Sequence, residues 1–311
     1  MEYPWGHAKR YNDFSSHIKS VHSERIQKVS IDAGFTCPNR DGSKGNGGCT
    51  FCNNNTFNPA YCMPTKSISA QIDQGVAFFA PKYKTQKYLA YFQAYSNTYG
   101  EIEELKRKYD EALSNPSVVG LVIGTRPDCM SDDLLDYFTD LNKKTDLTIE
   151  YGIESTIDKT LNLINRGHSY EDSVVAINKT AQRGISVGGH LILGLPGESY
   201  DDILSHAAVV SKLPLSYLKL HQLQIVKGSQ LGRDYLAGRY TDKLFTLEEY
   251  IELVVDFVER LSPEIILERF ISQSPGDLLI APKWGVKNFE FVAKVEKRLK
   301  ERDTHQGRLY V

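Results

Sequence analysis

Residues 29–52 read VSIDAGFTCPNRDGSKGNGGCTFC, a short apolar run that leads directly into a glycine-rich loop with three cysteines. The run Val29-Ser30-Ile31 predicts the end of a buried strand, because β-branched residues precede a segment rich in turn formers. In barrels of parallel strands, the chemistry sits in the loops that follow the carboxyl ends of the strands. A chemically distinctive loop in this position therefore indicates a fold built from strand–loop–helix units.

The three cysteines, Cys37, Cys49 and Cys52, are spaced C-x11-C-x2-C. Four glycines between the first two give the loop enough conformational freedom for the thiolates to converge. Three thiolates can hold three irons of a [4Fe–4S] cluster and leave the fourth iron open to a substrate or cofactor. A structural zinc site is the alternative on this segment alone, but it usually needs four nitrogen or sulfur ligands. The nearest additional donors are Cys62, His7, His17 and His22.

Composition places the chain among ordinary globular proteins. Its 311 residues are 41% hydrophobic and 24% charged, which excludes disordered, collagen-like and coiled-coil chains. The net charge of −2 is unlike that of a strongly basic nucleic-acid binder, although a near-neutral total leaves room for a local basic face. The five cysteines are too few for a disulfide scaffold, and their number is odd.

The N-terminal residues lack the apolar segment of a signal peptide, and no apolar run approaches the roughly 18 residues of a membrane helix. We therefore expect a cytoplasmic protein without a membrane partner. In that reducing compartment, clustered cysteines bind metal more often than they form disulfides.

Short apolar runs alternate with longer amphipathic segments along most of the chain. Strands are predicted at residues 29–31, 87–94, 118–123, 148–153, 186–193 and 217–226. Helices are predicted at residues 68–79, 102–113, 132–139, 157–164, 170–183 and 200–212. Such alternation is typical of parallel βα units. The sequence therefore predicts an α/β fold, a partial (β/α)6 TIM-like barrel with a short helical C-terminal extension.

The pattern changes near residue 241, after which helices are predicted at residues 247–261 and 289–300. We expect three regions: an N-terminal extension (1–24), the barrel (25–240) and the C-terminal extension (241–311). Residues 283–308 contain eight basic and four acidic side chains, and half of this excess lies on the predicted helix 289–300. This segment is either a solvated helix face or a surface that contacts phosphates.

Four further motifs follow the cysteine loop in order: GTRPD (124–128), GIES (152–155), NRGHS (165–169) and HLILGLPG (190–197). Together with the loop they resemble the radical S-adenosylmethionine (SAM) enzymes. The radical SAM domain of the catalytic subunit of Elongator, a tRNA wobble-uridine enzyme, is particularly similar. The resemblance continues through LKLH (218–221) and GRY (238–240), so that it covers about residues 25–240.

Two features depart from Elongator. About 70 residues follow Tyr240, too few for the acetyltransferase domain of Elongator's catalytic subunit. The motifs WGHAKRY (5–11) and IAPKWG (280–285) instead look like the stand-alone YtqA/YhcC-type radical SAM proteins. Within that group, the MnmL-like members are linked to the processing of tRNA wobble-uridine side chains.

The resemblance implies a [4Fe–4S] cluster held by Cys37, Cys49 and Cys52, with SAM on the open iron. Electron transfer into the SAM sulfonium would yield a 5′-deoxyadenosyl radical; the cofactor supplies this chemistry, and the protein supplies position and dryness. Cys62 and Cys129 are then left over as expected structural thiols. We expect one cluster only, because a second would need more cysteines than the chain has.

The resemblance also implies residues that would bind SAM. Glu154 would accept hydrogen bonds from its ribose or amino group, and Arg166 would bind its carboxylate through a planar fork of donors. An ordinary ion-paired glutamate and a helix-surface arginine are the alternatives. The other candidates, which turn formation and barrel packing would also explain, are Gln93, Tyr95, Asn97, Gly194, Leu195 and Gly197.

Four residues are candidates for catalytic contact with the substrate. Arg126 and Asp128 follow the third predicted strand, while Lys219 and His221 lie two apart on the sixth and so share one face. These side chains could hold an anionic group of the substrate or stabilise an intermediate. For His221, as for His190, a hydrogen-bonded core histidine is an equal alternative.

By this resemblance, the protein would convert 5-carboxymethylaminomethyluridine at the tRNA wobble position, with or without a 2-thio group, into 5-aminomethyluridine. tRNA would be its partner, a flavodoxin or ferredoxin its reductant, and a separate methyltransferase the next enzyme. One alternative is a radical SAM oxidoreductase for a small molecule such as a tetrapyrrole. Another is a non-catalytic iron–sulfur or zinc protein.

Overall fold

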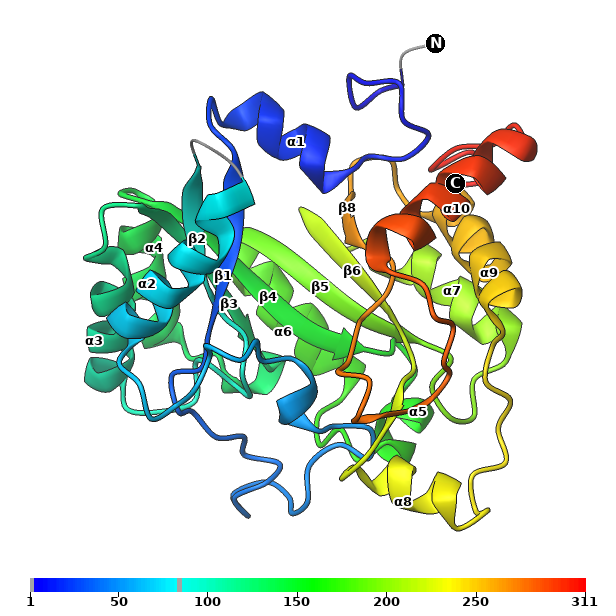
Figure 1. Cartoon of the computed structure of the whole chain (residues 1–311), viewed down its shortest axis with the longest axis horizontal. Helices are drawn as coiled ribbons and strands as arrows, with labels where there is room; N and C mark the ends of the chain where they lie inside the picture. The colour runs from blue at the N-terminus through cyan, green and yellow to red at the C-terminus, as the bar shows by residue number, and fades with distance from the viewer. Residues whose placement is uncertain (1–2, 83–85) are drawn as a thin grey trace.

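A curled sheet of seven parallel strands forms the centre of the molecule (Figure 1). The computed structural model describes residues 3–82 and 86–311. The strands are β1 (Ile26–Ile31), β2 (Lys87–Phe92), β3 (Val118–Thr125), β4 (Asp146–Glu154), β5 (Ser186–Leu193), β6 (Tyr217–Gln222) and β8 (Ile266–Arg269). They lie in chain order, and every neighbouring pair is parallel. The predicted partial barrel is confirmed.

Six helices connect these strands, and each begins within one residue of its predicted start. They are α2 (Ile68–Phe79), α3 (Ile102–Leu113), α4 (Asp132–Asn142), α5 (Asp158–Leu163), α6 (Tyr170–Ala181) and α7 (Tyr200–Val210). Capping boxes explain why two of the starts are well defined. Ser169 before α6 and Ser199 before α7 each accept a hydrogen bond from the backbone of an aspartate three residues on, which bonds back to the cap.

Side chains alternate between the two faces of the sheet, as the period of a strand requires. On β4, Tyr151 is fully buried and its hydroxyl lies 2.7 Å from Thr180 Oγ1 on α6, so this face packs on the helices. Glu150, its neighbour on β4, instead lines the interior of the barrel. Gly75 on α2 shows how closely helix and sheet approach, because an added Cβ would lie 2.3 Å from Val29 Cγ1 on β1.

The seventh strand, β8, was not predicted from the sequence. It pairs with β6 and lies within the C-terminal region, between α9 (Leu247–Arg260) and α10 (Asn288–Glu301), which were both predicted. The predicted strand 217–226 also ends early, at Gln222, and the chain resumes as β7 (Ile225–Val226). β7 pairs antiparallel with β9 (Leu279–Ala281), which forms a small second sheet.

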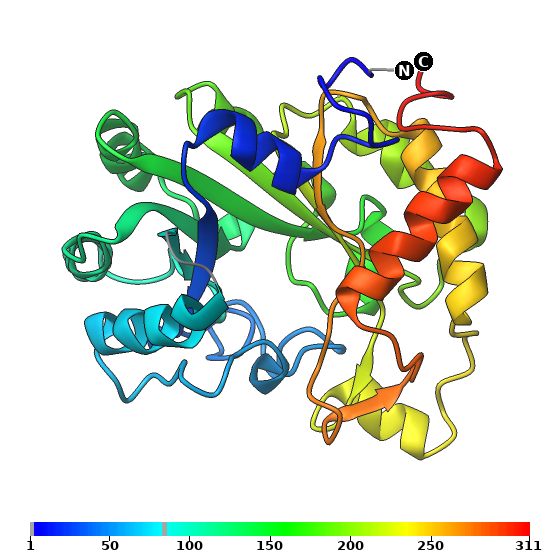
Figure 2. The same cartoon turned by 45° about the horizontal axis from the view of Figure 1, so that its top comes forward.

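The N-terminal segment packs against the C-terminal one, and Figure 2 shows the two ends of the chain at the same edge of the molecule. Arg10 Nη1 donates to Thr304 O (3.0 Å), and the Asn12 amide donates to Gln306 Oε1 (2.9 Å). The helix α1 (Phe14–Val21) follows, and α8 (Gln230–Leu236) lies beyond β7. Across the part of the chain that is described, no helix is both long enough and apolar enough to span a bilayer.

Candidate active site

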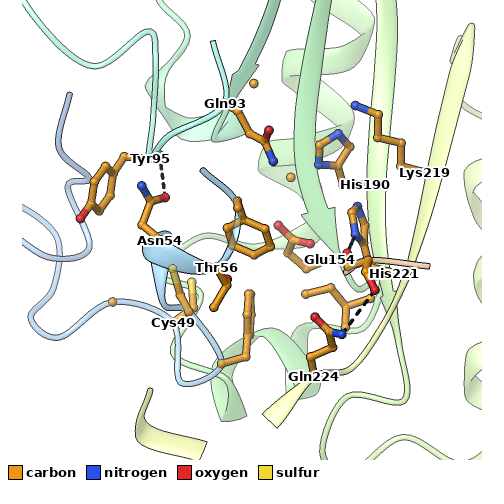
Figure 3. Close-up of a pocket in the computed structure, with 18 of the residues that line it drawn as sticks. Cys49, Asn54, Thr56, Gln93, Tyr95, Glu154, His190, Lys219, His221 and Gln224 are labelled. Carbon is orange, nitrogen blue, oxygen red and sulfur yellow. Dashed lines mark hydrogen bonds between the residues drawn. The ribbon is translucent and has the colours of Figure 1, made fainter. Parts of the chain in front are cut away.

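One cavity lies where the cysteine loop meets the carboxyl ends of the strands, and side chains from β2 to β8 line it (Figure 3). It brings together residues that are far apart in the sequence. Ten of the predicted site residues line it: Cys37, Cys49, Cys52, Gln93, Tyr95, Arg126, Glu154, Arg166, Lys219 and His221. This is the position at which barrels of parallel strands carry their chemistry.

The three thiols lie on one wall of this cavity, next to two guanidinium groups. Arg166 Nη1 lies 3.5 Å from Cys49 Sγ, and Arg40 Nη2 donates to the carbonyl of Cys52 at 2.9 Å. Asn39 Nδ2 approaches Cys49 Sγ at 3.9 Å. In residues 3–82 and 86–311, no three His, Cys, Asp or Glu side chains are arranged to hold a single metal ion.

The residues present fit a [4Fe–4S] cluster with one iron open to SAM. Three soft sulfur donors of one loop line the same cavity, which is the ligand type and number that such a cluster requires. The guanidinium groups of Arg40 and Arg166 would offset part of its negative charge. Nε of Arg166 is buried without a hydrogen-bond partner, so the side chain keeps a donor for a further group.

Glu154 and Arg166 lie side by side in the cavity wall. Arg166 Nη2 lies 3.6 Å from Glu154 Oε1 and donates to the carbonyl of Gly152 at 2.5 Å. Glu154 ends β4 with a φ of +67°, a conformation that costs a non-glycine residue free energy and is often found at functional sites. Burial alone would lower the pKa of Arg166, but the neighbouring Cys49 and Glu154 raise it, so the guanidinium stays charged.

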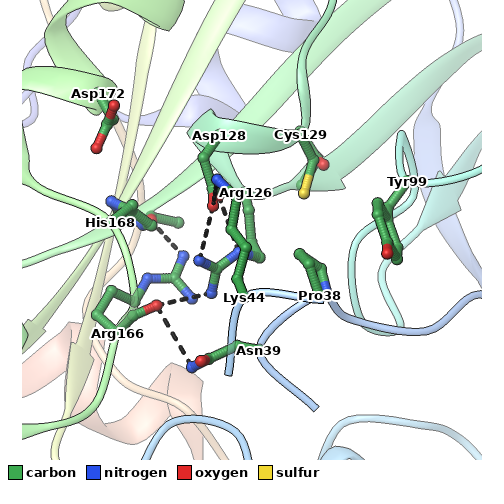
Figure 4. Close-up of polar contacts among 12 residues, drawn as sticks. Pro38, Asn39, Lys44, Tyr99, Arg126, Asp128, Cys129, Arg166, His168 and Asp172 are labelled. Atoms are coloured by element: carbon green, nitrogen blue, oxygen red, sulfur yellow. Dashed lines mark hydrogen bonds and ion pairs between the residues drawn. The ribbon is translucent and has the colours of Figure 1, made fainter. Parts of the chain in front are cut away.

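Arg126 and Asp128 form a bidentate ion pair next to Arg166 (Figure 4). Arg126 Nε lies 2.9 Å from Asp128 Oδ1, Nη2 lies 3.0 Å from Oδ2, and Nη1 donates to the carbonyl of Arg166 at 2.8 Å. Burial tends to raise the pKa of Asp128, but hydrogen bonds from Arg126 and Lys44 and the charge of Arg126 lower it to about 2. Asp128 is therefore ionised at neutral pH and suits a positioning role better than proton donation.

A buried ionic network forms the floor of the barrel. Lys219 Nζ lies 2.5 Å from Glu150 Oε2 and 3.3 Å from Glu268 Oε1. Lys28 Nζ lies 2.9 Å from Glu150 and 2.7 Å from Glu268. Burial would raise the pKa of both carboxyl groups, but the two lysines lower it. Lys219, a predicted substrate contact, is thus already neutralised by carboxylates of the protein.

Sequence reasoning missed the other members of this network. The signal for Glu150 was present, since it is a charged residue between apolar neighbours in a predicted strand. Lys28 and Glu268 gave a weaker signal, because Lys28 lies 122 residues from Glu150 and 240 residues from Glu268 along the chain. Only the curvature of the sheet brings β1, β4, β6 and β8 around one point.

Two histidines continue the network toward the cavity. His190 Nε2 lies 3.0 Å from Glu150 Oε2, and the His190 and His221 ring centroids are 5.4 Å apart. His221 Nδ1 is hydrogen bonded to Ser272 Oγ, whereas its Nε2 has no partner. Burial and the charges of His190 and Arg269 hold the pKa of His221 well below its usual value, so it is a neutral imidazole.

Five predicted residues do not line this cavity: Asp128, Asn97, Gly194, Leu195 and Gly197. Asn97 Nδ2 donates to the carbonyls of Phe92 (3.1 Å) and Gly124 (2.7 Å) and so joins the ends of β2 and β3. Gly194 and Gly197 have φ values of +90° and +80°, and Leu195 is 2% exposed in an apolar cluster. In the structure these residues shape turns and packing around the site.

Part of the basic C-terminal segment is paired with acidic side chains of α9. Arg302 lies 2.7 Å from Asp256 Oδ1 and 2.9 Å from Glu259 Oε2, and Arg298 lies 2.6 Å from Glu252 Oε1. Arg298 on α10 and Arg302 directly after it therefore hold this segment on α9. Lysines on α10, such as Lys294 and Lys300, are exposed.

Comparison with known proteins identifies the class. Residues 41–210 match the family model of the radical SAM superfamily, and residues 215–301 match that of the Radical_SAM C-terminal domain. The chain therefore belongs to the radical SAM superfamily. Enzymes of this superfamily use a [4Fe–4S] cluster and S-adenosylmethionine, so the protein is a radical SAM enzyme.

The chain is similar over nearly its whole length to two proteins without a stated activity. It is 35% identical to YtqA of Bacillus subtilis, over 97% of this chain and 93% of YtqA. It is 34% identical to YhcC of Escherichia coli, over 94% of this chain and 93% of YhcC. The resemblance to the YtqA/YhcC-type proteins is confirmed.

More distant matches concern Elp3 and tRNA uridine. The archaeal Methanocaldococcus infernus Elp3 structure superposes with a TM-score of 0.66 at 19% identity, over 91% of this chain but 64% of that one, which supports the fold. A tRNA uridine(34) acetyltransferase of the same organism is 27% identical over 47% of this chain and 27% of its own length. The chain thus spans less than two thirds of either.

Proposed function

We propose that this radical SAM enzyme modifies the side chain of the wobble uridine of tRNA, converting 5-carboxymethylaminomethyluridine into 5-aminomethyluridine. The observation that carries the proposal is that the three thiols, the pair Glu154–Arg166 and the polar side chains of the barrel floor all line one cavity. Similarity to a tRNA uridine(34) acetyltransferase supports uridine of tRNA as the substrate class. A reducing, cytoplasmic compartment suits the five free cysteines.

Cys37, Cys49 and Cys52 would hold the cluster. Arg166 would bind the carboxylate of SAM, and Glu154 would accept hydrogen bonds from its ribose or amino group. Gln93 and Tyr95, which line the same cavity, would lie at the edge of the SAM site. When bound, cluster and SAM supply abstraction of a hydrogen atom from the substrate, and a flavodoxin or ferredoxin would supply the electron.

The chain's own groups position SAM and substrate. Arg126 and Asp128 fix the backbone of Arg166 and hence the direction of its guanidinium fork. On the opposite side, the neutral His221 has a free Nε2 that can exchange a hydrogen bond or a proton with the substrate. Removal of one hydrogen atom next to the side-chain carboxylate, followed by transfer of one electron from the resulting radical to the oxidised form of the flavodoxin or ferredoxin and loss of a proton, would give an imine. Water would then cleave the imine, release the two-carbon unit as glyoxylate and leave the aminomethyl group, the substrate of a separate methyltransferase.

The proposal is tested by nucleoside analysis of tRNA from a strain that lacks the gene. We expect 5-carboxymethylaminomethyluridine to accumulate and the aminomethyl-derived nucleosides to disappear. Wild-type protein should restore the profile, whereas Cys52→Ala should not. An unchanged profile would contradict the proposal and favour a small-molecule substrate.

A further inference from the structure

Four of the cationic side chains that line the cavity already have partners within the protein. Lys219 is paired with Glu150 and Glu268, and Arg126 with Asp128. Arg40 donates to the carbonyl of Cys52 in the cysteine loop, and Arg166 pairs with Glu154 and is assigned to SAM in the proposed function. These groups have assigned partners, so none of them is a ready site for an anionic group of the substrate.

Arg269 is different. It ends β8, lines the cavity and is partly exposed there. Its guanidinium makes no hydrogen bond or ion pair with any residue in 3–82 or 86–311. Its Cα pairs with that of Lys219 on β6. The ammonium group of Lys219 forms ion pairs with Glu150 and Glu268, which the guanidinium of Arg269 does not.

The positive charge of Arg269 has no carboxylate to balance it in the neighbouring buried network. The buried network contains two lysines, Lys28 and Lys219, and two glutamates, Glu150 and Glu268, so its formal charges cancel. Arg269 adds one positive charge next to this neutral set. That charge is felt inside the cavity, since it is among the causes that lower the pKa of His221, after burial and the charge of His190.

We propose that Arg269 binds the anionic group of the substrate and selects for it. A planar fork with no internal partner is well suited to hold a carboxylate through two hydrogen bonds. His221, whose Nε2 has no partner, lines the same cavity. That the anion is the carboxylate of the wobble-uridine side chain rests on the proposed function; that the site takes an anion does not.

The test compares three variants with the reconstituted wild-type protein. Arg269→Gln removes the charge, Arg269→Lys keeps the charge without the fork, and Arg107→Gln is a matched control on the exposed face of α3, outside the cavity. The probes are two anticodon stem–loop RNAs, one with 5-carboxymethylaminomethyluridine and one with 5-aminomethyluridine. Their affinities are measured anaerobically by fluorescence anisotropy. N-methylglycine, the side-chain fragment, is a third probe, followed by NMR.

We expect wild type and Arg107→Gln to bind the carboxylate RNA about tenfold more tightly than the aminomethyl RNA. Arg269→Gln should lose this preference, and Arg269→Lys should restore part of it. If wild type shows no preference between the RNAs but binds N-methylglycine only when Arg269 is present, the anion site stands and the uridine substrate is wrong. If binding of neither probe depends on Arg269, the proposal is overturned.

Discussion

At Gly152 the site has no room for a side chain. An added Cβ would lie 2.5 Å from Glu154 Oε1 and 2.7 Å from Arg166 Nη2, so a methyl group must displace both. We expect Gly152→Ala to weaken SAM binding by about tenfold or more while leaving iron content unchanged. Gly276→Ala is the matched control, because its Cβ would meet nothing within 4 Å. Equal SAM affinity of both variants in equilibrium dialysis would remove Glu154 and Arg166 from the SAM site.

Asp128 gives the protein a pH-dependent contribution to stability. Its pKa falls from 3.8 to about 2 on folding, because Arg126 and Lys44 outweigh its burial. A lowered pKa stabilises the folded state above the unfolded value, and this gain is lost as the pH falls from about 4 to 2. Asp128→Asn should therefore lower the free energy of unfolding by about 2 kcal/mol at pH 7. Urea unfolding at several pH values should show the difference shrinking below pH 4.

At the scale of elements, the ionic network ties β1, β4, β6 and β8 into one barrel floor. Lys219→Met removes one cation and leaves two buried carboxylates with Lys28 as their shared lysine. Breaking a buried pair in this way typically costs about 3–5 kcal/mol, so the variant should unfold at lower urea concentration. The double variant Lys219→Met/Glu150→Gln should recover part of the loss. If the single variant is as stable as wild type, Lys219 is not a structural cation.

The elements themselves were largely predictable from the sequence, and physical reasons explain the exceptions. Runs such as 186–193 are local signals, and they agree with the structure. The capping boxes at Ser169 and Ser199, which the structure shows, explain why two of the predicted helix starts are well defined. β8 has only four residues, ILER, and two of them are charged, so the sequence shows no apolar pattern that would predict a strand. Arg269 was missed together with β8, because Arg269 reaches this cavity only when β8 joins the sheet.

The cysteine loop was predictable because its information lies in residue type and spacing. What spacing could not show is which cations are already neutralised. Lys219 and Arg126 were predicted as anion-binding groups, yet their partners Glu150 and Asp128 hold them in the structure. Those pairings depend on side-chain directions and on strands that meet only after folding.

At the scale of the whole molecule, two classes of basic side chain on α10 and directly after it should behave differently. Lys294 and Lys300 are exposed, whereas Arg302 bridges to Asp256 and Glu259 on α9. Replacing both lysines by Gln should weaken tRNA binding and reduce its salt dependence, with little effect on stability. Arg302→Gln should instead lower the melting temperature. Unchanged salt dependence in the double-lysine variant would show that α10 is a solvated face.

We propose that one cavity holds both the radical SAM cofactors and a modified wobble uridine of tRNA. This proposal is tested most directly by incubating the anaerobically reconstituted protein with SAM, a reductant and tRNA that carries 5-carboxymethylaminomethyluridine, followed by mass spectrometry of the nucleosides. We predict formation of 5-aminomethyluridine together with 5′-deoxyadenosine, and neither product with Cys52→Ala. Formation of 5′-deoxyadenosine while the modified uridine stays intact would contradict the account.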